Sequence, residues 1–244
     1  SVLNTFAKLE FNNYWYETGT PDYLIKLLKL HSYNLEKIVN EEVGTKILNS
    51  SYTSSTNPIP VIFQSGYLTI TDYDKEFKLY KLGFPNEEVK EGFLNYILPF
   101  YTSISENETE FYIMNFVREV RAGKTDAFMQ RLKSFFANTP YELVKELENH
   151  YQNVLFILCN LCGFYTRAEY HTSQGRIDMT METSDYVYIF EFKFEKSAEE
   201  ALQQIKANNY AEPFRTSGKK VFLIGANFNN TLRNIERYVV EEVS

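Results

Sequence analysis

The chain has few of the residues that hold transition metals or form disulfides. Its 244 residues include two cysteines, Cys159 and Cys162, and three histidines, His31, His150 and His171. A CxxC spacing occurs in redox and zinc motifs, but a zinc site needs further ligands, and the histidines show no spacing that would supply them. Because both cysteines lie in the apolar helical pattern NVLFILCNLCGF, we expect two small buried thiols in a core helix.

Long apolar runs are also missing. No segment approaches the roughly 20 apolar residues that cross a bilayer, and the first residues lack a basic stretch followed by an apolar one. We therefore expect a cytoplasmic protein with no membrane span. The content of 44% hydrophobic and 23% charged residues is typical of a globular protein, and the length allows one large domain or two smaller ones. We favour two domains, 1–102 and 103–244.

The chain has no excess of positive charge. Its formal net charge of −7 argues against a protein that coats nucleic acid through charge alone. A bound divalent cation can still provide the positive charge that a phosphodiester needs at one site. The composition is therefore compatible with an enzyme that acts on nucleic acid, and it argues against a basic protein that covers nucleic acid.

A complete nucleotide-binding loop is absent as well. The sequence AGKT resembles the end of the phosphate-binding loop of many ATPases, but Arg118 stands where that loop has its first glycine, and no strand precedes it. Gly123 is better interpreted as the end of one helix, with the next helix starting at Thr125 or Asp126.

The first region combines short helices with a hairpin. Thr20 and Pro21 are typical of a helix start, and a polar segment rich in serine and proline separates this helix from the next. The order of elements resembles a winged-helix module. The predicted elements are a helix after Pro21, a short helix ending at Gly66, strands at 66–71 and 77–82, and a helix from Pro85 to about Leu98.

The second region alternates helices and strands in a way that predicts a mixed α/β sheet flanked by helices. Apolar residues have helical spacing up to about residue 162, alternate with polar residues as in strands over 164–194, and have helical spacing again from 198. The predicted elements are two helices within 106–137, a long helix over 141–162, strands at 164–171, 176–182 and 186–194, a helix over 198–210, a strand at 221–225, and a last helix over 232–242.

The segment YVYIFEFKF, residues 186–194, is the most informative part of the chain. Its aromatic and β-branched residues predict a strand that is covered on both faces, interrupted only by Glu191 and Lys193. Because side chains alternate along a strand, these two charges share one face, while Phe190, Phe192 and Phe194 share the other. One face therefore carries the polar chemistry.

An aspartate breaks a similar alternation upstream, in GRIDMTMET. Asp178 shares a face with Arg176, Thr180 and Glu182, opposite the apolar side chains of the same strand. Two neighbouring strands would then bring Asp178, Glu191 and Lys193 together. Burying two carboxylates is costly unless a cation neutralises them, which is the physical reason to expect a site rather than a structural ion pair.

Such a group suits metal-assisted phosphodiester cleavage. Carboxylate oxygens with several waters are the ligands that Mg²⁺ or Mn²⁺ prefer, and Asp178, Glu191 and the main-chain carbonyl of Phe192 would supply them. The metal lowers the pKa of water and stabilises the transition state. Lys193 would then position or deprotonate that water.

The order of Asp178 followed by Glu191-x-Lys193 resembles the PD-(D/E)XK nuclease superfamily. That resemblance implies a restriction-endonuclease-like fold, with a preceding helix that supplies a further acid and a following helix that carries a glutamine and an aromatic residue. The matching positions here are Glu148, Gln204 and Tyr210. The chain departs from the family pattern in one respect, because Ile177 stands where the motif has proline.

Longer strings are similar to a bacterial protein family of unassigned function. They are GRIDMTMETSDYVYIFEFK, AEEALQQIKANNYAEPF and GANF, together with YETGTPDYLIKLLK near the start. This resemblance implies that the chain is the C-terminal part of a longer protein whose N-terminal part is an AAA-ATPase-like domain. It implies a Mg²⁺-dependent nuclease domain whose partners are nucleic acid, with DNA expected, and the ATPase-like domain. The alternative from another class is a non-catalytic nucleic-acid-binding or regulatory module with a degenerate nuclease fold.

Overall fold

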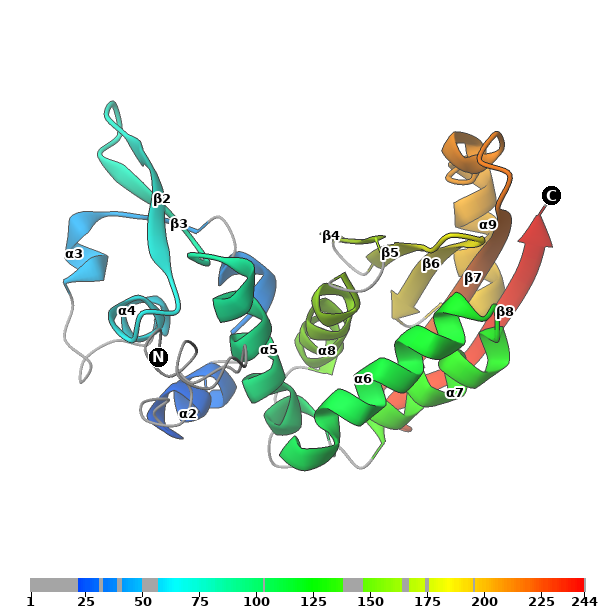
Figure 1. Ribbon diagram of the computed structural model, residues 1–244, viewed down its shortest axis with the longest axis horizontal. Coiled ribbons are helices and arrows are strands. Elements are labelled where there is room, and N and C mark those ends of the chain that lie inside the picture. Colours follow the sequence, from blue (N-terminus) through cyan, green and yellow to red (C-terminus); the bar gives the residue numbers. More distant parts are fainter. Residues whose placement is uncertain are drawn as a thin grey trace, which may run out of the picture. The chain divides into compact units, whose positions relative to one another are not determined.

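The structure is a computed structural model and is shown in Figure 1. It describes residues 22–30, 33–38, 41–49, 57–102, 104–137, 147–163, 167–173, 176–194 and 196–243. The chain divides into two compact units, residues 1–100 and 101–244. None of the described helices is long and apolar enough to cross a membrane.

The first unit combines short helices with a three-stranded antiparallel sheet of order β1-β3-β2. Its hairpin turns where the Asp74 carboxylate accepts hydrogen bonds from the backbone N–H groups of Glu76 and Phe77, at 2.8 and 2.9 Å. The predicted likeness to a winged-helix module is not confirmed, and the predicted start at Thr20 and Pro21 lies outside the described residues. The elements are α2 (Asp22–Leu30), η1 (Leu35–Ile38), β1 (Glu42–Val43), α3 (Thr45–Leu48), α4 (Ile59–Gln64), β2 (Thr69–Asp74), β3 (Leu79–Gly83) and α5 (Glu87–Tyr101).

The second unit is a five-stranded mixed sheet with helices on both faces, of order β4-β5-β6-β7-β8. All neighbouring strands are antiparallel except β6 and β7, which run parallel and are connected through α9. This mixed α/β architecture agrees with the prediction. The elements are α6 (Glu106–Arg121), α7 (Thr125–Phe136), α8 (Leu147–Gly163), β4 (Arg167–Ser173), β5 (Arg176–Glu182), β6 (Tyr186–Phe194), α9 (Ala198–Ala207), η3 (Glu212–Phe214), β7 (Lys220–Asn229) and β8 (Asn234–Val243).

Strand β6 lies in the middle of the sheet, and its residues 187–193 are all buried. On one face its aromatic rings pack against the helices: Phe128 of α7 lies 5.0 Å from the ring of Tyr188, and Tyr151 of α8 stacks 4.1 Å from Phe228 of β7. Aromatic pairs in such geometries add to the stability that burial provides. The aromatic face of YVYIFEFKF is therefore the main core of the unit.

The loop between α6 and α7 and the cysteines agree with their predictions. Gly123 has a φ of +71° after the end of α6, and a Cβ there would lie 2.6 Å from the ring of Tyr186. Helix α7 begins at Thr125. Cys159 and Cys162 are buried in α8 and form no disulfide, and burial raises the pKa of the Cys162 thiol. These cysteines are core residues.

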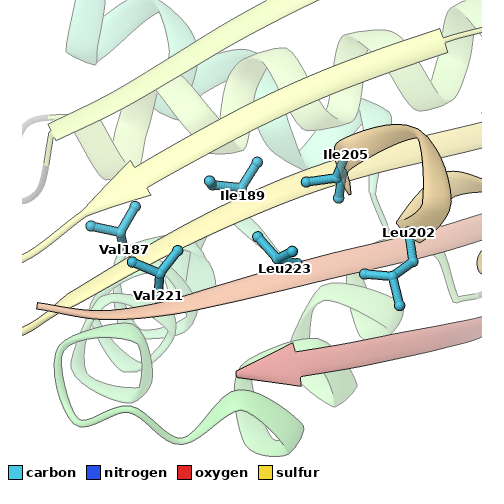
Figure 2. Packing of buried hydrophobic residues seen from close by; sticks show 6 residues of the cluster. All are labelled: Val187, Ile189, Leu202, Ile205, Val221 and Leu223. Carbon is cyan, nitrogen blue, oxygen red and sulfur yellow. The ribbon is translucent and has the colours of Figure 1, made fainter. Parts of the chain in front are cut away.

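Helix α9 covers the opposite face of the sheet. Leu202 and Ile205 of the helix join Ile189 of β6 and Leu223 of β7 in a buried apolar cluster, whose six residues are labelled in Figure 2. Gly225 permits the close approach of the helix, because a Cβ at that position would lie 2.2 Å from the carbonyl oxygen of Ala198. This packing places α9 directly above the face that carries the charges of β6.

The predicted last helix over 232–242 is wrong. The segment forms strand β8, which pairs with β7 along its length. Arg233 takes a φ of +51° in the tight turn between them. The apolar spacing of Ile235 and Val239 fits a helix, but the β-branched and aromatic residues of NIERYVVEEV gain more by pairing with the exposed edge of β7. Strand β7 is also longer than the predicted 221–225 for the same reason.

Candidate active site

The register of β5 and β6 places Asp178 directly opposite Glu191. Residues that are direct partners on neighbouring strands project from the same face of the sheet. The same row continues to His171 on β4 and to Gly225 on β7. The sheet thus forms a transverse row in which two carboxylates lie between an imidazole and a glycine.

Lys193 joins this group from two residues further along β6. Its ammonium Nζ lies 2.8 Å from Oε1 of Glu191. It also donates a hydrogen bond of 2.5 Å to Oε1 of Gln204 on α9. The side chain of Lys193 is 7% exposed, so the lysine is held between two acceptors in a largely water-free environment.

The start of α9 fixes the position of Gln204. Ser197 and Glu200 form a capping box, in which the Ser197 hydroxyl accepts from the N–H of Glu200 at 3.1 Å and the Glu200 carboxylate accepts from the N–H of Ser197 at 2.9 Å. Such caps satisfy the N–H groups of the first turn and define where a helix begins. Gly225 lets the same helix lie close to β7. Together these features bring the second turn of α9 onto Lys193.

The pKa of Glu191 is strongly perturbed. Burial and the hydrogen-bonded carboxyl of Asp178 together raise the pKa of Glu191 to about 7, although Lys193 acts in the opposite direction. The carboxyl is completely buried. A carboxyl with a pKa near neutrality beside a second carboxyl is poised to exchange its proton for a cation.

The donor atoms of this group suit a hard divalent cation. Within the described residues, no group of three or more histidine, cysteine, aspartate or glutamate side chains is arranged to hold a metal. Mg²⁺ needs less from the protein, because one or two carboxylates with several waters suffice. Asp178 and Glu191 fit that requirement, and the carbonyl of Phe192 is a further oxygen between Glu191 and Lys193.

Two predicted site residues are placed differently from the group. The side chain of Phe192 lies on the aromatic face, so its contribution to the site is restricted to its main-chain carbonyl. Glu148 lies exposed in the first turn of α8, which packs against that aromatic face through Tyr151, and its carboxylate accepts a hydrogen bond of 3.3 Å from Gln152. The role of Glu148 in the site stays a prediction.

A cavity of about 670 Å³ adjoins the group at Asp178. Tyr210, which the sequence placed near the site, lies in its wall. Alternation along β5 puts Thr180 and Glu182 on the face of Asp178, but the sequence analysis does not indicate His171 or the residues Pro213, Phe214 and Ser217 that follow Tyr210. These contributions depend on the pairing of β4 and on a turn without a periodic pattern. The lining residues are His171, Asp178, Thr180, Glu182, Ile189, Phe190, Tyr210, Pro213, Phe214 and Ser217.

A match to a known protein family lies within the second unit. A family model described as the PD-(D/E)XK nuclease superfamily matches residues 146–238. The matched range contains all the predicted site residues, from Glu148 to Gln204. The chain therefore carries the sequence features of a nuclease-type domain in its second unit.

The chain is also similar to a longer protein. A protein of Azotobacter chroococcum mcd 1, described as an uncharacterized protein in vnfD 5'region, is 31% identical over 258 residues. The alignment covers 99% of this chain and 48% of that protein, so the chain spans about half the length of the curated relative. No solved structure matches the chain.

Proposed function

We propose that the second unit is a metal-dependent nuclease domain that hydrolyses phosphodiester bonds of nucleic acid. The observation that carries this proposal is the direct opposition of Asp178 and Glu191, with Lys193 held 2.8 Å from Glu191. A purely structural ion pair would not need a second carboxylate directly opposite the buried Glu191. The match of residues 146–238 to the PD-(D/E)XK nuclease superfamily supports the same reaction.

Asp178 and Glu191 are the proposed ligands of Mg²⁺ or Mn²⁺, with the carbonyl of Phe192. When bound, such a cation lowers the pKa of water and stabilises negative charge on the phosphate in the transition state. Without a cation, Glu191 would retain its proton near neutral pH, because its pKa is about 7. With a cation bound, Glu191 would release that proton, because a metal ligand has to be ionised.

Lys193 is the proposed catalytic lysine. Its ammonium has three N–H donors, and Glu191 and Gln204 accept two of them. The third N–H is proposed to contact a phosphate oxygen or the attacking water. Gln204 acts as a positioning residue, because its amide oxygen fixes the ammonium over the same face as the carboxylates.

The proposal extends to one further residue of the site and to the partners of the domain. We include Glu148 as an additional acid of the site, which Glu148→Gln tests through a loss of metal affinity. The partners we propose are nucleic acid, with DNA expected, and an AAA-ATPase-like domain in a longer chain. The length of the Azotobacter chroococcum relative, about twice the aligned region, is compatible with such a domain.

Titration calorimetry with Mn²⁺ tests the metal site directly. Wild type is expected to bind Mn²⁺ at millimolar concentration or below, and Asp178→Asn is expected to lose that binding. Asp185→Asn is the matched control, because Asp185 is exposed in the turn between β5 and β6. Absence of binding in wild type would favour the alternative, a non-catalytic nucleic-acid-binding or regulatory module.

A further inference from the structure

The cavity beside Asp178 has a floor of strands and a wall formed by the segment that follows α9. Thr180 of β5 and Ile189 of β6 contribute to the floor, and Tyr210 and Phe214 come from the segment between α9 and β7. Its volume of about 670 Å³ is within the range of small-molecule sites, roughly 300 to 1,000 Å³. Because Asp178 borders it, a molecule in the cavity would adjoin the group formed by Asp178, Glu191 and Lys193.

The wall is held in a defined conformation. The backbone N–H of Tyr210 bonds the carbonyl of Ile205 at 3.3 Å, and Ser217 donates to the carbonyl of Phe214 from both its backbone N–H and its hydroxyl, at 3.0 and 2.6 Å. Lys219 connects the end of this segment to the end of β5. Its Nζ donates hydrogen bonds to Oε1 of Glu182 at 2.9 Å and to the carbonyl oxygen of Thr183 at 2.6 Å. A wall fixed in this way is preformed for a ligand, which lowers the entropic cost of binding.

The inner surface of the cavity combines aromatic rings with polar groups that can form hydrogen bonds. Tyr210 and Phe214 pack against the apolar cluster of Figure 2 while they line the cavity. Thr180, Ser217 and His171 add hydroxyl and imidazole groups that can donate and accept. A flat heteroaromatic ring fits these features, because it stacks on aromatic side chains and presents polar edges.

Charge excludes a phosphate as the main occupant. The two acidic residues of the lining are Asp178 and Glu182, and the positive charge of Lys219 is directed to Glu182 at 2.9 Å. A phosphate placed beside the carboxyl group of Asp178 would be repelled by negative charge, whereas a neutral base would not. The chemistry of the cavity therefore differs from that of the adjoining group, which has Lys193 to contact a phosphate.

We propose that this cavity binds a single unpaired nucleobase of the nucleotide next to the bond that is cut. This inference rests on the proposed function, because the group with Lys193 must hold the phosphate of the same strand. A base within a duplex is stacked on its neighbours and has to be extruded before it can enter such a pocket, which costs energy. The substrate class is therefore a single-stranded or frayed strand rather than an intact duplex.

Binding to strands that lack one base tests this inference independently of cleavage. The probe is a short fluorescent single-stranded DNA, compared by anisotropy with strands in which one abasic position is moved along the sequence, all in Ca²⁺. At one position, loss of the base is expected to weaken binding roughly 5- to 150-fold, which corresponds to the stacking of one base on an aromatic side chain. Equal binding of all the strands would overturn the inference.

Two variants tie the effect to the cavity. Phe214→Leu keeps the apolar packing but removes the aromatic face, and Thr180→Val removes a hydroxyl with little change in shape. Each is expected to reduce the difference between the intact and abasic strands, and an unchanged difference in Phe214→Leu would contradict the inference. Phe111→Ala is the control, because Phe111 is an exposed aromatic residue, 64% accessible, on α6.

Cleavage assays separate the two proposals. If the chain binds the base but does not cut any strand in Mg²⁺, the base pocket stands and the nuclease proposal fails. If it cuts strands in Mg²⁺ at a rate that ignores the missing base at every position, the nuclease proposal stands and the base pocket fails.

Discussion

Asp178 on β5 and Glu191 on β6 are direct cross-strand partners, and Glu191 is completely buried. Two carboxyl groups in this relationship cannot both ionise without cost, so a proton or a cation has to be shared between them. The Lys193 ammonium offsets part of that charge from 2.8 Å. The proposed chemistry of the site follows from this one relationship.

The stability of the metal-free protein should depend on the ionisation of Glu191. Its pKa is raised from 4.5 to about 7, so the folded state retains a proton that the unfolded state has lost between these values. The free energy of unfolding should therefore fall as the pH rises from about 4.5 to about 7, by an amount on the order of 3 kcal/mol. Urea denaturation at several pH values measures this. Glu191→Gln should lack this component, and the same decline in that variant would contradict the assignment.

Mg²⁺ and the proton should compete for Glu191. Metal binding requires the ionised carboxylate, so the increase in melting temperature that Mg²⁺ produces should grow between pH 6 and pH 8, around the pKa of about 7. Thermal denaturation with and without Mg²⁺ at each pH tests this expectation. Glu191→Gln should show a small increase that does not vary with pH. A Mg²⁺ effect of equal size at both pH values in wild type would exclude Glu191 as a ligand.

Gln204 should act on catalysis through Lys193. Gln204→Leu removes the acceptor that lies 2.5 Å from the lysine ammonium, and outer partners of this kind typically contribute roughly 10- to 100-fold. We expect kcat to fall by about that factor while KM and Mn²⁺ affinity change little. Gln203→Leu, at an exposed position of the same helix, is the matched control. Equal kcat values for the two variants would remove Gln204 from the site.

Gly225 should be required for the position of α9. Gly225→Ala places a Cβ 2.2 Å from the carbonyl oxygen of Ala198 and 2.5 Å from the backbone nitrogen of Leu202, so the helix must move. A loss of roughly 1 to 3 kcal/mol in the free energy of unfolding is expected, as for other overpacked positions, together with weaker cleavage. Gly163→Ala is the control, because an added Cβ there has no heavy atom within 4 Å. Wild-type stability in Gly225→Ala would show that the helix does not depend on this contact.

Much of the second unit could be predicted because its strands alternate strictly. The period of two in YVYIFEFKF fixes which side chains share a face, and the β5–β6 register then brings Asp178 opposite Glu191. The same reasoning failed for residues 232–242, where apolar spacing fits a helix and only the free edge of β7 decides for a strand. The alternation of apolar and polar side chains can be seen within one segment of the sequence. The pairing of β8 with the edge of β7 depends on the folded sheet and cannot be seen there.

The surroundings of the site were less predictable for similar reasons. The resemblance to the nuclease superfamily indicates Gln204, but its contact with Lys193 also requires Gly225, whose role depends on the distance between α9 and β7. Phe214 and Ser217 belong to a turn held by backbone hydrogen bonds, which no sequence period indicates. Side chains contributed by such turns become visible only when the chain is folded.

Metal-dependent cleavage by wild type and by Lys193→Ala is the most direct measurement of the proposed activity. Labelled single- and double-stranded DNA and RNA are incubated with Mg²⁺ or Mn²⁺, with Lys124→Ala as the control for loss of an exposed lysine at the start of α7. We predict metal-dependent cutting by wild type and Lys124→Ala, and none by a folded Lys193→Ala. Cleavage by Lys193→Ala at the wild-type rate, or no cleavage by wild type with either metal, would contradict the proposed active site.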